Sequence, residues 1–201
     1  MSHAEDNKVE APISEESWAT RSGVRLTVRV ARAADQQGMR AFIDGLSRES
    51  RYFRFLTGGS VADEVIRGFV SHGMGRDVAL VVISRDADTG AETIVANAEY
   101  VVNDQDIAEL AVVVADDWQG QGLGRRLIQR LQQLARASRL RGMRGDVLSE
   151  NRRMLAIMRD SGFAARRNPE DSYLHEVSLM LAESRTPARE HRLPRDWFAA
   201  V

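Results

Sequence analysis

The stretch VVVADDWQGQGLGRRL, residues 112–127, decides how the whole chain is interpreted. Its first residues end an apolar run, which is typical of a buried strand. Gly120, Gly122 and Gly124 follow at alternate positions, and glycine adopts backbone angles that other residues resist. A helical pattern starts directly after them, so the first N–H groups of that helix have no partner inside it. Together with the helix dipole, those groups predict an anion site suited to a pyrophosphate.

Two common phosphate motifs do not fit this stretch. A P-loop needs a lysine followed by serine or threonine after its glycines, and no lysine follows here. A dinucleotide fingerprint needs a further glycine, but Arg125 and Leu127 stand at the two positions where it would fall. The pattern therefore disfavours nucleoside triphosphates and dinucleotides. Arg125 and Arg126 are expected to add positive charge at the edge of the anion site.

Outward from this stretch, the hydrophobic pattern alternates between strands and helices. Period-two alternation predicts strands, and apolar residues at i, i+3 and i+4 predict helices. The segment 107–114 is too apolar to face water on one side, so we expect it to be a central strand. The strands are expected at 24–30, 77–84, 92–102, 107–114, 143–148, 163–167 and 173–181, and the helices at 35–46, 47–56, 63–72, 121–140 and 151–161. These elements predict an α/β fold with a single mixed central sheet of about six to seven strands flanked by helices.

The composition limits the classes of function. The chain has 201 residues and no cysteine, which excludes a disulfide, a thiolate metal site and a cysteine nucleophile. Four scattered histidines show no metal-ligand spacing, so no metal is expected. The net charge of −1 lacks the basic excess of a nucleic-acid binder, and no apolar run approaches the ~18 residues of a membrane helix. We therefore expect a cytoplasmic protein with neither nucleic acid nor a membrane as partner.

The two ends of the chain differ from its middle. Residues 1–22 are polar, without sustained periodicity or a signal-peptide pattern, and are expected to form a flexible N-terminal segment. Residues 183–201 form a polar C-terminal tail that carries Trp197 and Phe198 near its end. The domain itself is expected to span residues 23–182.

Four segments, taken in order, resemble a known family. Gln119–Gly124 matches the Q/R-x-x-G-x-G/A signature of the GCN5-related N-acetyltransferase (GNAT) superfamily. The segment 149–154, followed by 161–163, is similar to the next motif of that superfamily. The segments 50–55 and 108–114 closely resemble the acetyltransferase domain of bacterial Pat-type protein lysine acetyltransferases. The resemblance covers about residues 26–181 and implies a GNAT-like fold.

The resemblance also implies a co-substrate and the residues that bind it. Members of the superfamily bind acetyl-CoA and transfer its acetyl group directly to an amine. Asn151 would hydrogen-bond the pantetheine arm, cap its own helix, or do both. The residues implied in cofactor binding are Val112, Val114, Gln119, Gly120, Gln121, Gly122, Leu123, Gly124, Arg125, Arg126 and Asn151.

Glu109 is the candidate general base. A lysine amine has a solution pKa near 10.4, so it arrives as an ammonium group and must lose a proton before it can attack. Glu109 lies in an otherwise apolar strand, and burial beside Leu110, Val112 and Val114 is expected to raise its pKa. Pat-type domains have their presumed general base at this position of the motif. Glu99 on the preceding strand is the rival base, and an ion pair between Glu109 and an arginine is the structural alternative.

Three functions remain open from the sequence. The first is transfer of an acetyl group to a protein lysine, which the Pat-type segments favour. The second is the same chemistry on a small amine such as a polyamine, an amino acid or an aminoglycoside. The third is a module that senses acetyl-CoA without turnover, against which the presence of Glu109 argues. The sequence leaves both a monomer and a homodimer open.

Overall fold

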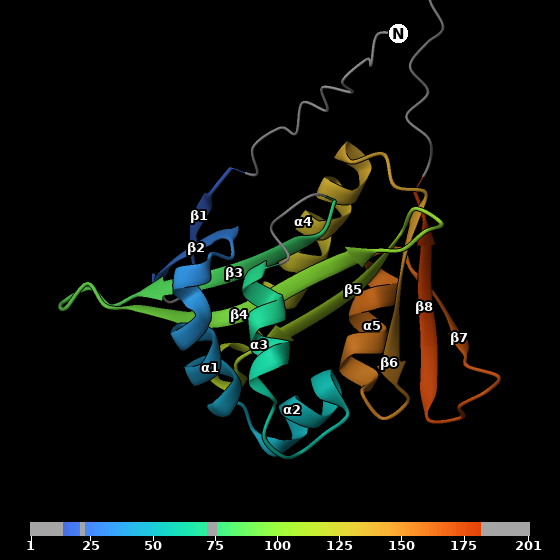
Figure 1. Ribbon diagram of the computed structural model, residues 1–201, viewed down its shortest axis with the longest axis horizontal. Coiled ribbons are helices and arrows are strands. Elements are labelled where there is room, and N and C mark those ends of the chain that lie inside the picture. The colour runs from blue at the N-terminus through green and yellow to red at the C-terminus, as the bar shows by residue number, and fades with distance from the viewer. Residues whose placement is uncertain (1–13, 21–22, 72–75, 182–201) are drawn as a thin grey trace, which may run out of the picture.

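The computed structural model of the protein describes residues 14–20, 23–71 and 76–181. Eight strands form one sheet in the order β1-β2-β3-β4-β5-β6-β8-β7 (Figure 1). The strands are β1 (Glu16–Ala19), β2 (Arg25–Val30), β3 (Val78–Arg85), β4 (Glu92–Val102), β5 (Ile107–Val114), β6 (Gly142–Leu148), β7 (Ala164–Arg167) and β8 (Leu174–Met180). The helices are α1 (Gln36–Asp44), α2 (Arg48–Phe55), α3 (Asp63–Ser71), α4 (Leu123–Ala137) and α5 (Arg152–Asp160), with short 3-10 turns at Ala33–Asp35 and Asp116–Trp118. The expected α/β fold with a single mixed sheet is confirmed, with one strand more than expected.

Strand β5 lies in the middle of this sheet, as its apolar sequence predicts. Strands β2 to β5 form an antiparallel meander, while β5 and β6 are parallel neighbours joined through α4. Parallel strands need such a crossover, and a helix is its usual form. The pairing between β5 and β6 covers only three residue pairs and ends at Glu109 and Arg144. Beyond that pair the two strands separate.

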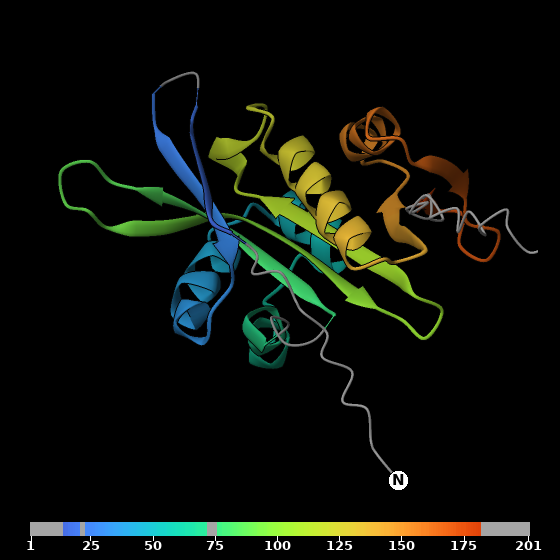
Figure 2. The same ribbon diagram turned by 90° about the horizontal axis from the view of Figure 1, so that it is seen from above.

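Two hydrophobic cores lie on opposite faces of the sheet. Helices α4 and α5 cover one face, and α1 and α3 cover the other (Figure 2). Successive side chains of a strand point to opposite faces, so β5 contributes to both cores. Ala108 and Leu110 pack in the core with α4, whereas Val113 packs in the core with α1 and α3. This alternation decides which residues of β5 can meet a ligand on each face.

Strand β1 is the element that the sequence analysis missed. Residues 16–19 pair antiparallel with β2, and Trp18 packs against the core that contains α4. The expectation of a flexible segment over residues 1–22 is therefore wrong for these four residues. A strand of four residues is too short to show a period, and it is held by the free edge of β2. Residues 1–13 and 182–201, including Trp197 and Phe198, lie outside the described residues.

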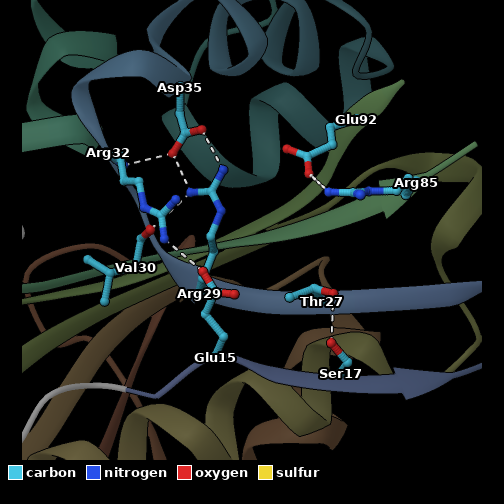
Figure 3. Close-up of polar contacts among 9 residues, drawn as sticks. All are labelled: Glu15, Ser17, Thr27, Arg29, Val30, Arg32, Asp35, Arg85 and Glu92. Atoms are coloured by element: carbon cyan, nitrogen blue, oxygen red, sulfur yellow. Dashed lines mark hydrogen bonds and ion pairs between the residues drawn. The ribbon is translucent and has the colours of Figure 1, made fainter. Parts of the chain in front are cut away.

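A network of polar contacts joins β1 and β2 to the start of α1 (Figure 3). Both guanidinium NH groups of Arg29 donate to the Asp35 carboxylate at 2.7 Å, and both side chains are about 10% exposed. Asp35 also accepts a hydrogen bond from the backbone N–H of Arg32 at 2.7 Å. Asp35 stands at the N-cap position of α1, but its carboxylate accepts no hydrogen bond from that helix. Its role is thus to pair with a buried arginine.

Candidate active site

A cleft of about 540 Å³ opens where β5 and β6 separate. This volume lies within the usual range for small-molecule sites. The cleft is lined by β5 from Leu110 onward, by the glycine-rich loop, by β6 around Gly145, and by residues of α2 and α5. Strand β5 continues to Val114 with no further pair on β6, so its backbone can meet a ligand there.

Gly145 lies at the point where the two strands part. A Cβ atom at this position would lie 2.9 Å from the carbonyl oxygen of Leu110, a distance that real side chains do not tolerate. Glycine therefore lets β6 approach β5 closely before the strands diverge. The apex of the cleft depends on this one small residue.

The glycine-rich loop has the conformation that its sequence predicts. Gly120 and Gly122 have φ angles of +81° and +86°, in the left-handed region that favours glycine. Gly122 is the N-cap of α4, and no side chain caps that helix. Its first N–H groups are thus available to an anion beside the cleft. Gly124 differs because it lies inside α4 without a positive φ angle, so the conformational argument does not extend to it.

Gln119 braces the loop from within the protein. Its amide nitrogen donates to the Val114 carbonyl and to the Ser50 hydroxyl, each at 3.1 Å. Its amide oxygen accepts a hydrogen bond from Arg153 at 3.0 Å. The side chain of Gln119 therefore links β5, α2 and α5, and it lines the cleft as a support for the loop.

Asp116 ties α2 to the start of the same loop. Its carboxylate accepts hydrogen bonds from the N–H and the hydroxyl of Ser47, both at 2.8 Å, and from the hydroxyl of Ser50 at 2.7 Å. Partial burial acts to raise the pKa of Asp116, but these hydrogen bonds outweigh it and lower the pKa. The N-terminal part of α2, which borders the cleft, is thus held by a charged carboxylate.

The positive charges around the cleft differ in part from the expected ones. Arg125 lines the cleft and pairs with Asp160 at 2.6 Å. Arg126 does not line it, because consecutive helical residues point about 100° apart. Its guanidinium stacks 4.2 Å from the ring centre of Trp18 and pairs with Glu16 of β1. The expectation that Arg126 borders the anion site is therefore wrong.

Two other arginines border the cleft, and the sequence analysis missed them. Arg152 and Arg153 lie in the first turn of α5 and line the cleft. Their signal in the sequence is a pair of arginines directly after Asn151, at a helix start. Gln121 lines no part of the cleft, and its amide donates to the Asp117 carbonyl at 3.2 Å.

Asn151 caps α5. Its side-chain oxygen accepts a hydrogen bond from the N–H of Met154 at 3.0 Å, which confirms the capping role. Asn151 also lines the cleft together with Val112, Val114, Leu123 and the loop glycines. Its contact with a pantetheine arm stays a prediction.

Glu109 is placed differently from what the sequence suggested. Its side chain is 48% exposed, pairs with Arg144 of β6 and is not among the residues that line the cleft. The expectation of burial beside Leu110, Val112 and Val114 is wrong, because those three lie on the opposite face of the strand. The alternative of an ion pair with an arginine is the arrangement that the structure shows.

Glu99, the rival base, lies on the same face of the sheet as Glu109. The register of β4 and β5 places Glu99 opposite Ala111 and Glu109 opposite Val101. Glu99 is buried and pairs with Arg54, which itself lines the cleft. The Arg54 guanidinium lies 4.8 Å from the ring centre of Phe55. Burial lowers the pKa of Arg54, although the charge of Glu99 acts to raise it. The carboxylate of Glu99 is thus part of a buried ion pair.

Unlike Glu109 and Glu99, the carboxylate residue Asp146 of β6 lines the cleft, and the sequence analysis missed it. Loss of hydration and the carboxylate of Glu176 raise the pKa of Asp146, with a smaller effect from Glu109, while Arg144 opposes the rise. Its signal in the sequence is a single acidic residue inside the strand 142–148.

No group of three or more metal-ligating side chains occurs within residues 14–20, 23–71 and 76–181. In the same part of the chain, no helix has the length and apolar character needed to cross a membrane.

Comparisons with known proteins agree with this arrangement. Residues 62–163 match the model of the acetyltransferase (GNAT) family. The chain is 30% identical over 162 residues to acetyltransferase PA5475 of Pseudomonas aeruginosa, covering 78% of this chain and 86% of that protein. The GNAT domain of S. lividans PAT superposes with a TM-score of 0.72 at 22% identity, over 83% of this chain and 97% of that one. Spermidine N-acetyltransferase from Vibrio cholerae, solved with CoA and spermine, superposes with a TM-score of 0.60 at 19% identity, over 77% and 95% of the chains.

Proposed function

The chain belongs to the acetyltransferase (GNAT) family, which uses acetyl-CoA as co-substrate for N-acetylation, and we propose that its acceptor is a protein lysine. The observation that carries the proposal is the cleft, in which a parting pair of strands meets a glycine-rich loop at an uncapped helix start. The Pat-type character of the segments 50–55 and 108–114 supports lysine as the acceptor. The first of these segments forms most of α2, which borders the cleft through Ser50, Phe53 and Arg54.

We assign the two parts of acetyl-CoA to the two parts of the cleft. The pyrophosphate fits the N-terminus of α4, where Gly120 and Gly122 carry no side chain between the backbone and a ligand. Arg125, Arg152 and Arg153 supply positive charge for the phosphates. The pantetheine arm fits along β5 between Val112 and Val114, where the strand has no partner on β6.

The chemistry requires a proton acceptor on the acceptor side of the cleft. The amine nitrogen forms a bond to the thioester carbon, the carbon–sulfur bond breaks, and the thiolate of CoA leaves with the electron pair. A thiol has a pKa near 8.5, so this thiolate leaves at neutral pH with little help from an acid. Glu109 is the proposed general base, on the family resemblance. Because its carboxylate lies outside the lining of the cleft, it needs an intermediate group to receive the proton.

A panel assay tests the acceptor. The purified chain is incubated with acetyl-CoA and either lysine-bearing proteins, polyamines, amino acids or aminoglycosides, and the released CoA thiol is measured. We expect turnover with protein lysines, and acetylation confined to small amines would overturn the acceptor class. Tight binding of acetyl-CoA without any turnover would identify a sensing module instead.

Three further measurements address the rest of the proposal. Glu109→Gln is expected to lower kcat by ~10²-fold or more with little change in acetyl-CoA affinity. Light scattering of the same sample separates a monomer from a homodimer. Cell fractionation tests the expected cytoplasmic location.

A further inference from the structure

Five charged side chains share one face of the sheet beside the cleft. The ion pair between Glu109 and Arg144 places both on the same face of β5 and β6. Asp146 lies two residues beyond Arg144 and therefore points to that face as well. Glu176 of β8 stands directly opposite Asp146 in the register, and Arg166 of β7 stands opposite Glu176. The side chains thus form a row from Glu109 across to Arg166.

Asp146 alone of this row lines the cleft. It follows Gly145, at the apex where β5 and β6 part, and so it lies at the point where the cleft opens between the two strands. Three other carboxylates line the cleft, those of Glu49, Asp116 and Glu150. Hydrogen bonds to Ser47 and Ser50 occupy the Asp116 carboxylate, whereas Glu49 lies on α2 and Glu150 lies between β6 and α5, away from the two parting strands. Apart from the backbone pairing of β6 with β8, the carboxylate of Asp146 forms no hydrogen bond or ion pair with another described residue. Its carboxylate is therefore available to a ligand.

The charges around Asp146 suit a proton acceptor. The Asp146 side chain is exposed, but the hydration that it loses to its surroundings raises its pKa. Glu176 and Glu109 also favour its neutral form, whereas Arg144 opposes them. A carboxylate whose pKa is raised in this way is a stronger base than one in water. Glu109, half exposed at the start of the gap, is well placed to pass a proton on to solvent.

We propose that Asp146 takes the proton from the acceptor amine and hands it on to Glu109. The amine arrives as an ammonium group, so one N–H bond first breaks as its proton moves to the Asp146 carboxylate and on through Glu109 to water. The neutral nitrogen then forms the N–C bond while the C–S bond breaks, and a second N–H bond breaks as its proton moves to the Asp146 carboxylate. The electron pair of the C–S bond leaves on the thiolate of CoA, and the proton passes from Asp146 to Glu109 and then to water. This role rests on the proposed function, and it makes Asp146 the catalytic residue that touches the amine.

A double-mutant cycle tests the hand-over. Asp146→Asn keeps the size of the side chain and removes its basicity, and we expect kcat to fall ~10²-fold or more. Groups that act as one unit are not additive, so Asp146→Asn combined with Glu109→Gln should be no slower than the slower single variant. Losses that multiply in the double variant would overturn the hand-over. Full activity of Asp146→Asn would overturn the role of Asp146.

A pH profile provides a readout that a structural role would not move. Glu176→Gln removes a neighbouring negative charge, so the rise of log kcat with pH should shift to lower pH. The same acceptor is used for both proteins, so the titration of the amine cancels in the comparison. An unshifted profile would count against Asp146 as the titrating group.

The controls keep the outcomes separable. Asp88→Asn, in the exposed turn between β3 and β4, should leave kcat and the profile unchanged. Asp146→Glu retains a carboxylate and should recover part of the activity, whereas melting temperature and acetyl-CoA affinity show whether each variant is folded. Wild-type turnover is measured first. Its absence would overturn the proposed function itself, whereas turnover that survives Asp146→Asn overturns only this inference.

Discussion

Replacing Gly122 with alanine tests the position of the pyrophosphate. Gly122 has a φ angle of +86°, and holding an L-residue in the left-handed region costs about 1–2 kcal/mol. Alanine also lowers the conformational entropy of the unfolded chain, which stabilises the folded state by about 0.4–1 kcal/mol. The net loss of stability should therefore be about 1 kcal/mol. A Cβ atom at this position meets no protein atom within 4 Å, so the variant should fold. A melting temperature about 2–4 °C lower is expected for a chain of this size.

The effect on acetyl-CoA should be larger than the effect on folding. Gly122 lines the cleft and caps α4, so the new methyl group would occupy the space through which the pyrophosphate approaches the helix N–H groups. We expect affinity for acetyl-CoA to fall ~10- to 100-fold, or about 1.4–2.7 kcal/mol, measured by calorimetry.

A matched control separates backbone strain from lost binding. Gly23, in the turn between β1 and β2, has the same φ angle of +86° and also no atom within 4 Å of a Cβ. Gly23→Ala should therefore lose similar stability and bind acetyl-CoA like the wild type. Equal affinity of Gly122→Ala and the wild type would refute the placement of the pyrophosphate at this loop.

The other predictions concern the supports of the site. Asp35→Asn should lower the free energy of unfolding at pH 7 by about 3 kcal/mol in chemical denaturation, because it leaves the Arg29 guanidinium without its carboxylate. The Arg29 hydrogen bonds lower the pKa of Asp35, so the stability that Asp35 contributes is present above the ordinary aspartate pKa near 3.9 and is lost as pH falls through the lower folded value. Asp35→Asn should therefore make the free energy of unfolding depend less on pH in acid. An unchanged pH dependence below about pH 4 would refute this role of Asp35. In Asp116→Asn the side chain can no longer accept hydrogen bonds from Ser47 and Ser50 with both of its terminal atoms. The KM for the acceptor should therefore rise several-fold while the Kd for acetyl-CoA stays constant. The reverse pattern would show that this carboxylate supports the cofactor loop instead. A chain beginning at Gly23 lacks β1, with its strand pairing and the contact between Trp18 and Arg126, so we expect a loss of about 2 kcal/mol and a melting temperature about 4–8 °C lower; an unchanged Tm would show that β1 adds no stability.

Local patterns in this chain were strong enough to predict most elements. The strands 92–102 and 107–114 begin and end where the hydrophobic pattern predicts, because the alternation and the flanking turn residues act within a few positions. The positive φ angles of Gly120 and Gly122 are likewise a local requirement of the turn before α4. Helix α4 begins two residues later than predicted, because the glycine turn extends to Gly122.

Contacts between distant parts of the chain decided which side chains meet at the site, and local sequence patterns could not predict them. The sequence by itself determined most of the strands, the apolar character of the central one and the glycine turn before α4, since each depends on residues close together in the chain. Only the tertiary structure decided that Arg126 turns to Trp18, that Arg144 pairs with Glu109, and that Asp146 reaches the cleft. The direction of a side chain on a strand changes with a shift of one residue in register, and the separation of β5 from β6 depends on Gly145 meeting the backbone of Leu110. Such contacts join residues more than thirty positions apart, and their energy exists only once the two strands lie side by side.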